Sequence, residues 1–240
     1  MSTIPETAFV LAAGLGTRMR PLTDRLPKPL VPVAGRALID HVLDRIGAAG
    51  IARAVVNVHY MADAIEAHLA ARAAPAIVIS DERGQLLETG GGVRKALPLL
   101  GERPFLVHNS DSIWIEPGVQ NLSRLFAAFD ADRMDALLLL ADRTTSLGYS
   151  GRGDFDVRDD GAVARPAAGV TVPYVFAGVS MASPRLLRET PDGAFSLNRV
   201  WDRAMAEGRL RGITLAGTWM HVGDPAAVAA AERCMVDAHP

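Results

Sequence analysis

The sequence predicts an α/β protein with a mostly parallel sheet and helices on both faces. Short apolar runs, such as residues 54–58 and 136–141, alternate along the chain with stretches in which apolar residues recur at helical spacing. These runs are continuous rather than alternately polar, which is typical of strands buried on both sides. Together the two observations indicate a Rossmann-like, doubly covered sheet.

Each element of the first 145 residues has its own signal. Strands are expected from the apolar runs at 9–13, 54–58, 76–80, 105–107 and 136–141. Leu38, Ile39, Val42, Leu43 and Ile46 fall on one helical face, which Gly47 and Gly50 close. Further helices are expected at 62–71, 88–97 and 122–129.

The chain after residue 145 is richer in loops. Residues 148–153 and 166–169 are expected to be loops, 172–181 and 210–215 strands, and 194–207 a helix. A last helix is expected to begin with Asp224 as N-cap and Pro225 as its first residue. Because no repeat, low-complexity tract or linker occurs, we expect residues 1–240 to form a single domain, with a core at about 1–145 and a smaller lobe at about 146–240.

Composition narrows the functional classes. The net charge of −2 argues against a broad nucleic-acid surface. The N-terminal apolar run is too short to span a membrane and lacks the basic flank of a signal peptide. The one cysteine, Cys234, excludes an intrachain disulfide and suits a reducing compartment. We therefore expect a cytoplasmic protein with small-molecule partners, no nucleic acid and no membrane.

The most informative stretch follows the first predicted strand. Gly14 and Gly16 allow the backbone to pass close to a ligand, and successive N–H groups in such a loop can hold phosphate oxygens. Four basic residues follow within eleven positions, namely Arg18, Arg20, Arg25 and Lys28. Positive groups beside a glycine turn suit a triphosphate.

This stretch has three other interpretations. A dinucleotide fingerprint would require glycine or alanine at Met19, and the lysine motif of a P-loop is absent. A merely solvated basic loop remains an alternative. Lys28 argues against it, because Lys28 and Lys95 are the only lysines among 25 basic residues and Lys28 lies between two prolines that restrict its backbone.

Asp111 is the strongest candidate metal ligand. It follows the apolar run that begins at Phe105, at the carboxyl end of a predicted parallel strand, where α/β sheets bind ligands. A carboxylate suits Mg²⁺, which takes one or two protein carboxylates together with phosphate oxygens.

Residues 11–22 and 27–29 resemble the signature of the sugar nucleotidylyltransferase family. Further similar segments extend over nearly the whole chain, at 87–92, 109–111, 151–155, 176–178 and 219–224. The segments 87–92 and 151–155 are most similar to the short N-acetylmuramate-1-phosphate uridylyltransferases of cell-wall recycling. The family's fold is the predicted α/β sheet, and the lobe after residue 145 would then bind the sugar.

The resemblance implies roles for individual residues. Arg18 would grip the triphosphate, Lys28 would bridge the donor and acceptor phosphates, and Asp111 would hold Mg²⁺. The implied nucleotide-binding residues are Ala12, Ala13, Gly14, Gly16, Gly90 and Gly91. The implied sugar-binding residues are Asn109, Gly153 and Gly178, and we add Arg152 as a partner for an acceptor carboxylate.

The chain departs from the family pattern at two places. Ser110 replaces a glycine between Asn109 and Asp111, a small change. His221 stands where the family has its second metal-binding aspartate. The expected metal ligands are therefore Asp111 and His221, with Mg²⁺ as cofactor and Mn²⁺ as an alternative, because imidazole favours softer ions.

The expected activity is transfer of a nucleotidyl group from a nucleoside triphosphate, UTP by preference, to a sugar 1-phosphate, N-acetylmuramate 1-phosphate by preference. One alternative is a guanylyltransferase acting on mannose or heptose 1-phosphate. Another is a non-catalytic nucleotide-sugar sensor. A monomer or a small homo-oligomer is expected.

Overall fold

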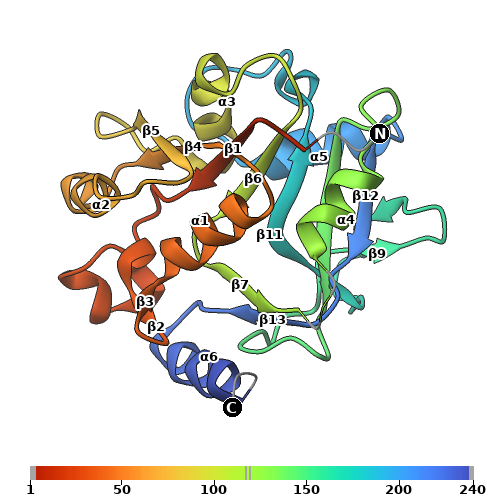
Figure 1. Ribbon diagram of the computed structural model, residues 1–240. Coiled ribbons are helices and arrows are strands. Elements are labelled where there is room, and N and C mark those ends of the chain that lie inside the picture. Colours follow the sequence, from red (N-terminus) through yellow and green to blue (C-terminus); the bar gives the residue numbers. More distant parts are fainter. Residues whose placement is uncertain (1–3, 117, 119, 238–240) are drawn as a thin grey trace.

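A seven-stranded sheet forms the centre of the molecule (Figure 1) in the computed structural model, which describes residues 4–116, 118 and 120–237. Its strand order is β12-β8-β11-β6-β1-β4-β5. The strands are β1 (Thr7–Leu11), β4 (Arg53–Val58), β5 (Ala76–Asp81), β6 (Phe105–Asn109), β8 (Ala136–Asp142), β11 (Tyr174–Ala182) and β12 (Leu210–Thr214). Only β11 runs antiparallel to its neighbours in this sheet. The predicted mostly parallel sheet is confirmed.

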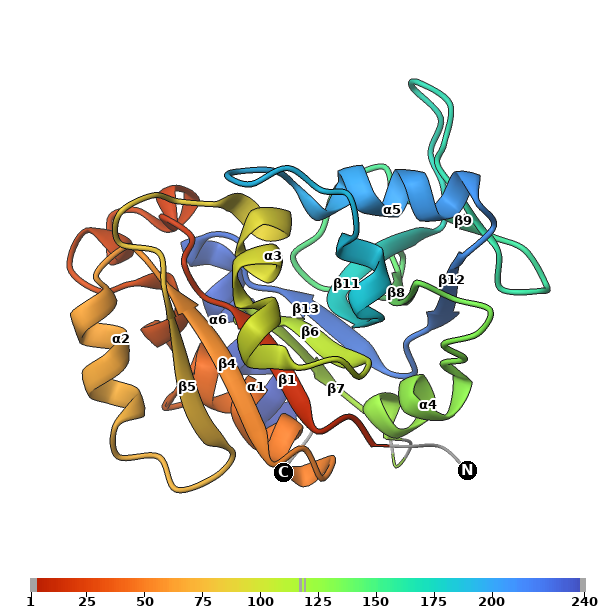
Figure 2. The same cartoon turned by 90° about the horizontal axis from the view of Figure 1, so that it is seen from above.

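Alternating side chains of each strand enter two separate cores. In β1, Val10 belongs to one apolar cluster and Phe9 to the other. The first core is covered by α1 (Leu38–Ala48), α2 (Ala62–Leu69) and α4 (Asn121–Ala128), the second by α3 (Glu88–Leu100) and α5 (Leu197–Ala206). Figure 2 shows α3 and α5 on one side of the sheet and α1 and α4 on the other, so the helical cover of both faces is confirmed as well.

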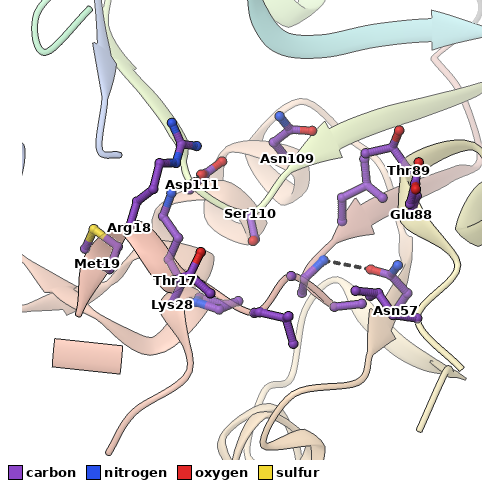
Figure 3. Close-up of a pocket in the computed structure, with 18 of the residues that line it drawn as sticks. Thr17, Arg18, Met19, Lys28, Asn57, Glu88, Thr89, Asn109, Ser110 and Asp111 are labelled. Carbon is purple, nitrogen blue, oxygen red and sulfur yellow. Dashed lines mark hydrogen bonds and ion pairs between the residues drawn. The ribbon is translucent and has the colours of Figure 1, made fainter. Parts of the chain in front are cut away.

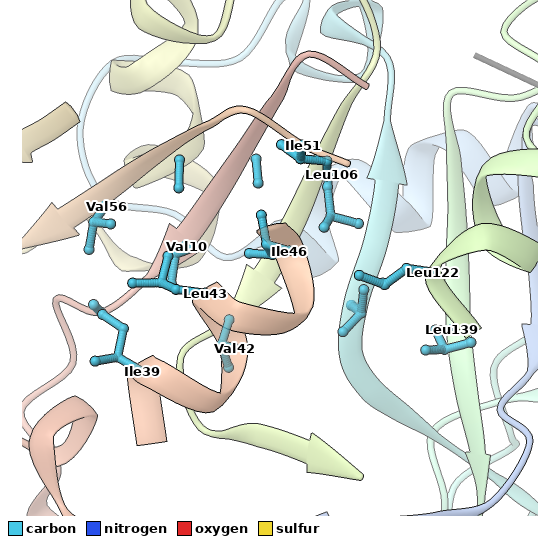
Figure 4. Packing of buried hydrophobic residues seen from close by; sticks show 14 of the residues in the cluster. Val10, Ile39, Val42, Leu43, Ile46, Ile51, Val56, Leu106, Leu122 and Leu139 are labelled. Atoms are coloured by element: carbon cyan, nitrogen blue, oxygen red, sulfur yellow. The ribbon is translucent and has the colours of Figure 1, made fainter. Parts of the chain in front are cut away.

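Helix α1 illustrates how the sequence pattern produces this packing. Its apolar residues at helical spacing are fully buried against sheet residues such as Val10 and Val56 (Figure 4). Burying each such side chain is worth about 1.5–3 kcal/mol. The face predicted from periodicity is the face that packs.

Several short elements complete the fold. Strands β7 (Ser112–Ile115) and β13 (Thr218–His221) form an antiparallel ribbon, and two further ribbons pair β2 (Pro32–Val33) with β3 (Arg36–Ala37) and β9 (Asp156–Val157) with β10 (Val163–Ala164). Three 3₁₀ turns, at Thr17–Met19, Leu22–Asp24 and Lys28–Leu30, occupy the long loop after β1. The strand β7 was not predicted, because it follows β6 after only two residues and its apolar run is short.

Helix boundaries follow local capping. Helix α6 (Pro225–Asp237) begins as predicted, because the Ala227 N–H donates to Asp224 Oδ1 at 2.9 Å. Helix α5 begins at Leu197, three residues later than expected, because the Ser196 side chain accepts from the Asn198 N–H at 3.2 Å.

The part of the chain after residue 145 contributes β11 and β12 to the central sheet. Its separate role as a sugar-side lobe stays a prediction. Among the helices of the described ranges, none is both long and apolar enough to cross a membrane.

Candidate active site

A cavity of about 570 Å³ lies at the carboxyl ends of β1 and β6. Figure 3 shows Arg18, Lys28 and Asp111 on one side of it and Asn57, Glu88 and Thr89 on the other. Of the predicted site residues, Ala12, Ala13, Gly14, Gly16, Arg18, Lys28, Asn109 and Asp111 line this cavity. The edge of the sheet at which α/β proteins bind ligands therefore gathers most of the predicted nucleotide-binding and catalytic residues.

The loop after β1 presents unused backbone N–H groups to the cavity. Within the described ranges, the N–H groups of residues 13–16 donate to no protein acceptor. Gly16 has φ +64°, and a side chain there would place Cβ 3.0 Å from Thr23 Cγ2 and 3.1 Å from Lys28 Cβ. The Thr23 hydroxyl donates to the Gly16 carbonyl at 2.8 Å and holds the turn. This arrangement is suited to binding phosphate oxygens.

Asn57 is a cavity residue that the sequence analysis did not identify. Its side chain is 1% exposed, and its Oδ1 accepts from the Ala12 N–H at 2.7 Å, which holds the chain where β1 ends. Asn57 lies near the carboxyl end of β4, as Asp111 lies just beyond β6. The sequence signal for Asn57 as a site residue was its position near the end of a predicted strand. The apolar residues around it indicated only a buried strand without a site residue.

Lys28 and Asp111 form an ion pair at the cavity wall. The Lys28 side chain is 12% exposed and that of Asp111 25%. Burial opposes ionisation of Asp111, but the charge and hydrogen bond of Lys28 outweigh it and lower the pKa of the Asp111 carboxyl. The carboxylate is consequently charged at neutral pH, and the lysine is held in place by it.

His221 lies beside this pair because β13 pairs with β7. The register sets His221 opposite Ser112, the residue after Asp111. Burial lowers the pKa of His221, Asp111 raises it, and Lys28 and Arg18 lower it further; the net shift is downward. The imidazole is therefore neutral at pH 7, with a lone pair free to bind a cation.

The site offers few protein ligands for a divalent ion. Across the described residues no group of three or more His, Cys, Asp or Glu side chains is gathered tightly enough to hold a metal alone. Of the predicted ligands, Asp111 lines the cavity, and His221 lies close to Asp111 but outside the lining. One carboxylate with an adjacent imidazole fits an ion that takes most of its ligands from substrate phosphates and water, as Mg²⁺ commonly does.

Arg18, unlike Lys28, is not held by an ion pair in the described part of the chain. It lies in the 3₁₀ turn after the glycines, lines the cavity and is exposed. Its guanidinium is thus available for a ligand anion.

The predicted sugar-side residues lie around β11. Gly178 has φ +80°, and a Cβ there would lie 2.8 Å from Ser112 Cβ and 3.1 Å from Asn109 Nδ2, so only glycine fits against these two residues. The Gly153 N–H donates to the Tyr149 hydroxyl at 3.1 Å. Arg152 is exposed in the same loop and lies outside the cavity lining. Their contacts with a sugar stay predictions.

Tyr149 is a second residue near the predicted site that was not identified from the sequence. Its ring lies 6.1 Å from that of Trp219 and 6.3 Å from that of His221, measured between centroids. It therefore joins the loop that carries Gly153 to the strand that carries His221.

Gly90 and Gly91 lie in the first turn of α3, outside the cavity lining. Both of their N–H groups donate to the Phe195 carbonyl, at 2.7 and 3.1 Å. A side chain at Gly90 would collide with the Phe195 ring. The structure therefore gives these glycines a packing role, and the neighbouring Glu88 and Thr89 line the cavity. Nucleotide contact by Gly90 and Gly91 stays a prediction.

Comparison with known proteins identifies the family. Residues 7–165 match the family model described as nucleotidyl transferase. The chain belongs to the nucleotidyl transferase family. The transferase is 54% identical over 99% of its length to the whole of the N-acetylmuramate alpha-1-phosphate uridylyltransferase of Caulobacter vibrioides. It is 36% identical, over 90% of its length and 92% of the relative, to the protein of the same name from Neisseria meningitidis serogroup B.

The fold has solved counterparts. The inositol-1-phosphate CTP transferase from T. maritima superposes with a TM-score of 0.77 at 18% identity, covering 95% of the transferase and 93% of that chain. At this identity the likeness concerns the fold, and it agrees with the sheet and helices described above.

Proposed function

We propose that the enzyme transfers the uridylyl group of UTP to N-acetylmuramate 1-phosphate and releases pyrophosphate. The main support for nucleotidyl transfer is that one cavity is lined by free backbone N–H groups together with Arg18, Lys28 and Asp111. The choice of UTP and of the sugar rests on the full-length likeness to the Caulobacter uridylyltransferase.

The proposed reaction is a single in-line displacement. An oxygen of the sugar phosphate forms a bond to the α-phosphorus of UTP, and the bond from that phosphorus to the bridging oxygen breaks as pyrophosphate leaves. Protein groups contribute by positioning and by charge neutralisation, and no covalent nucleophile is required. The N–H groups of residues 13–16 and the Arg18 guanidinium would bind the triphosphate, and Lys28 would lie between donor and acceptor phosphates.

We further propose that a divalent ion, Mg²⁺, is held by Asp111 and His221. When bound, it supplies positive charge to the phosphate oxygens. Asp111 would provide negative charge to the ion, and Lys28 keeps that carboxylate ionised. Asn109 and Gly178 would face the sugar side, together with Gly153 and Arg152.

The metal proposal predicts an unusual ion preference. Because imidazole is a softer ligand than carboxylate, we expect Mn²⁺ to support turnover at least as well as Mg²⁺ in the wild type. His221→Asp restores a second carboxylate and should shift the preference towards Mg²⁺, whereas His221→Ala should weaken Mn²⁺ dependence most. Turnover measured over a titration of each ion tests this. An unchanged ion preference in both variants would assign His221 to hydrogen bonding instead.

The substrate proposal is tested by measuring pyrophosphate release for four triphosphates against several sugar 1-phosphates. UTP with N-acetylmuramate 1-phosphate should have the highest kcat/KM. A preference for GTP with mannose 1-phosphate would favour a guanylyltransferase, and binding without any pyrophosphate release would favour a sensor.

The lactyl carboxylate of the acceptor offers a matched control in the same assay. Arg152→Ala should raise KM for N-acetylmuramate 1-phosphate, whereas KM for N-acetylglucosamine 1-phosphate, which lacks that carboxylate, should not change.

The proposed substrates fit a role in cell-wall recycling in the cytoplasm, where nucleoside triphosphates are available.

A further inference from the structure

A second buried carboxylate lies behind the cavity, and the chemistry above does not use it. Glu82 directly follows β5, and its side chain is 1% exposed. No cation pairs with it among the described residues. A buried carboxylate without a counter-charge is costly unless hydrogen bonds satisfy it, so its presence requires a reason.

Two hydrogen bonds satisfy Glu82, one to each oxygen. Asn57 Nδ2 donates to Oε1 at 2.8 Å, and the Leu87 N–H donates to Oε2 at 3.2 Å. Asn57 in turn accepts from the Ala12 N–H at 2.7 Å. A continuous chain of hydrogen bonds thus runs from the end of β1, past the ends of β4 and β5, to the residue before α3.

The two ends of this series of hydrogen bonds lie in opposite walls of the cavity. Ala12 begins the glycine-rich loop, and Leu87 immediately precedes Glu88 and Thr89, which line the other side. Glu88 has φ +58°, a conformation that a non-glycine residue adopts only when its surroundings hold it there. The Glu82 bond to Leu87 is one of the contacts that hold this turn.

The space around the pair is closed by a glycine of α3. A Cβ on Gly92 would lie 2.8 Å from Glu82 Oε1 and 2.9 Å from Asn57 Nδ2. Gly92 is helical and buried, at a position where alanine would otherwise favour the helix by about 1 kcal/mol. Glycine at this position therefore leaves room for the Asn57–Glu82 contact.

We propose that Glu82 is a positioning residue that acts through Asn57 to hold the two nucleotide-binding walls at a fixed separation. The inference rests on the proposed nucleotidyl transfer and concerns the nucleotide rather than the sugar, because neither end of the chain of bonds reaches β11 or residues 148–153. The order of the groups matters as well. The neutral amide of Asn57 lines the cavity, and the negative charge of Glu82 stays behind it, away from the triphosphate.

The test exchanges the two groups. Glu82→Gln leaves one acceptor where two are needed, and Asn57→Asp brings two carboxylates together. Each should weaken UTP binding about tenfold or more, as expected for loss of a hydrogen bond to a buried charged group. In the double variant Asn57→Asp/Glu82→Gln, all three bonds can re-form with one donor direction reversed.

We expect the double variant to bind UTP more tightly than either single variant, because the coupled hydrogen bonds are restored together. It should bind UTP less tightly than the wild type, because the carboxylate at position 57 then lines the cavity beside the triphosphate. KM for the sugar phosphate should stay unchanged in all three variants. Glu102→Gln, which alters an exposed carboxylate without a partner in the described part of the chain, serves as control and should change neither constant.

The proposed function and the role of Glu82 can fail independently, and different results would reveal each failure. A wild-type protein that binds no triphosphate and releases no pyrophosphate would contradict the proposed function. An active wild type would leave the role of Glu82 to be decided by the variants. Equal losses for both substrates, or a double variant as impaired as the two singles combined, would overturn the positioning role.

Discussion

Replacing Asp111 with asparagine is expected to lower kcat by a factor of about 10² or more, because the change removes the negative charge of the metal site while keeping its size. The same substitution takes the counter-charge from Lys28, whose side chain is only 12% exposed. Asp111→Ala should be at least as impaired. Single-turnover pyrophosphate release, with circular dichroism to confirm folding, measures the effect.

A matched control is available in the same sheet. Asp81 also lies at the carboxyl end of a parallel strand, but it is outside the cavity lining and is held by Arg83. Asp81→Asn should retain wild-type turnover. If the folded Asp111→Asn enzyme were fully active, the metal assignment would be wrong.

Lys28→Met is expected to impair both UTP binding and turnover, with kcat reduced by a factor of about 10², since one preorganised charge at the reacting phosphates is lost. The variant also changes Asp111. Burial then acts on this carboxyl without the lysine that now lowers its pKa, so the pKa of Asp111 rises. The acid side of the pH–rate profile should accordingly move to higher pH than in the wild type.

Other basic residues of the same region distinguish a specific phosphate site from a solvated loop. Arg18→Ala should reduce turnover, because its free guanidinium faces the cavity. Arg36→Ala should not, because Arg36 is engaged with Asp44 on the surface. Equal effects of Lys28→Met, Arg18→Ala and Arg36→Ala would contradict a specific site.

Much of the site was predictable because its residues are continuous in sequence or end a strand. Gly14, Gly16 and Lys28 occur within one loop whose composition alone indicates phosphate binding. Asp111 follows an apolar run, and parallel topology brings the carboxyl ends of such runs to one edge. The structure gathers these residues around a single cavity for that reason.

Glycine was the least informative signal. Gly16 is glycine because its φ is positive and Thr23 and Lys28 lie against it, Gly90 because the Phe195 ring packs against it, and Gly92 because Glu82 and Asn57 fill the space. A sequence shows that a position tolerates only a small residue, but not which partner requires it. The partner can be distant in sequence, since Phe195 lies more than a hundred residues after Gly90.

The sequence by itself therefore determined the α/β class, the helical faces and the glycine-rich loop that lines the cavity, because periodicity and loop composition are local properties. Tertiary structure decided what depends on pairing between distant segments. The register of β7 with β13 sets His221 opposite Ser112, beside Asp111. The adjacency of β4 and β5 brings Asn57 to Glu82. Both juxtapositions arise from strand order and register, which bring together segments that are distant in the sequence.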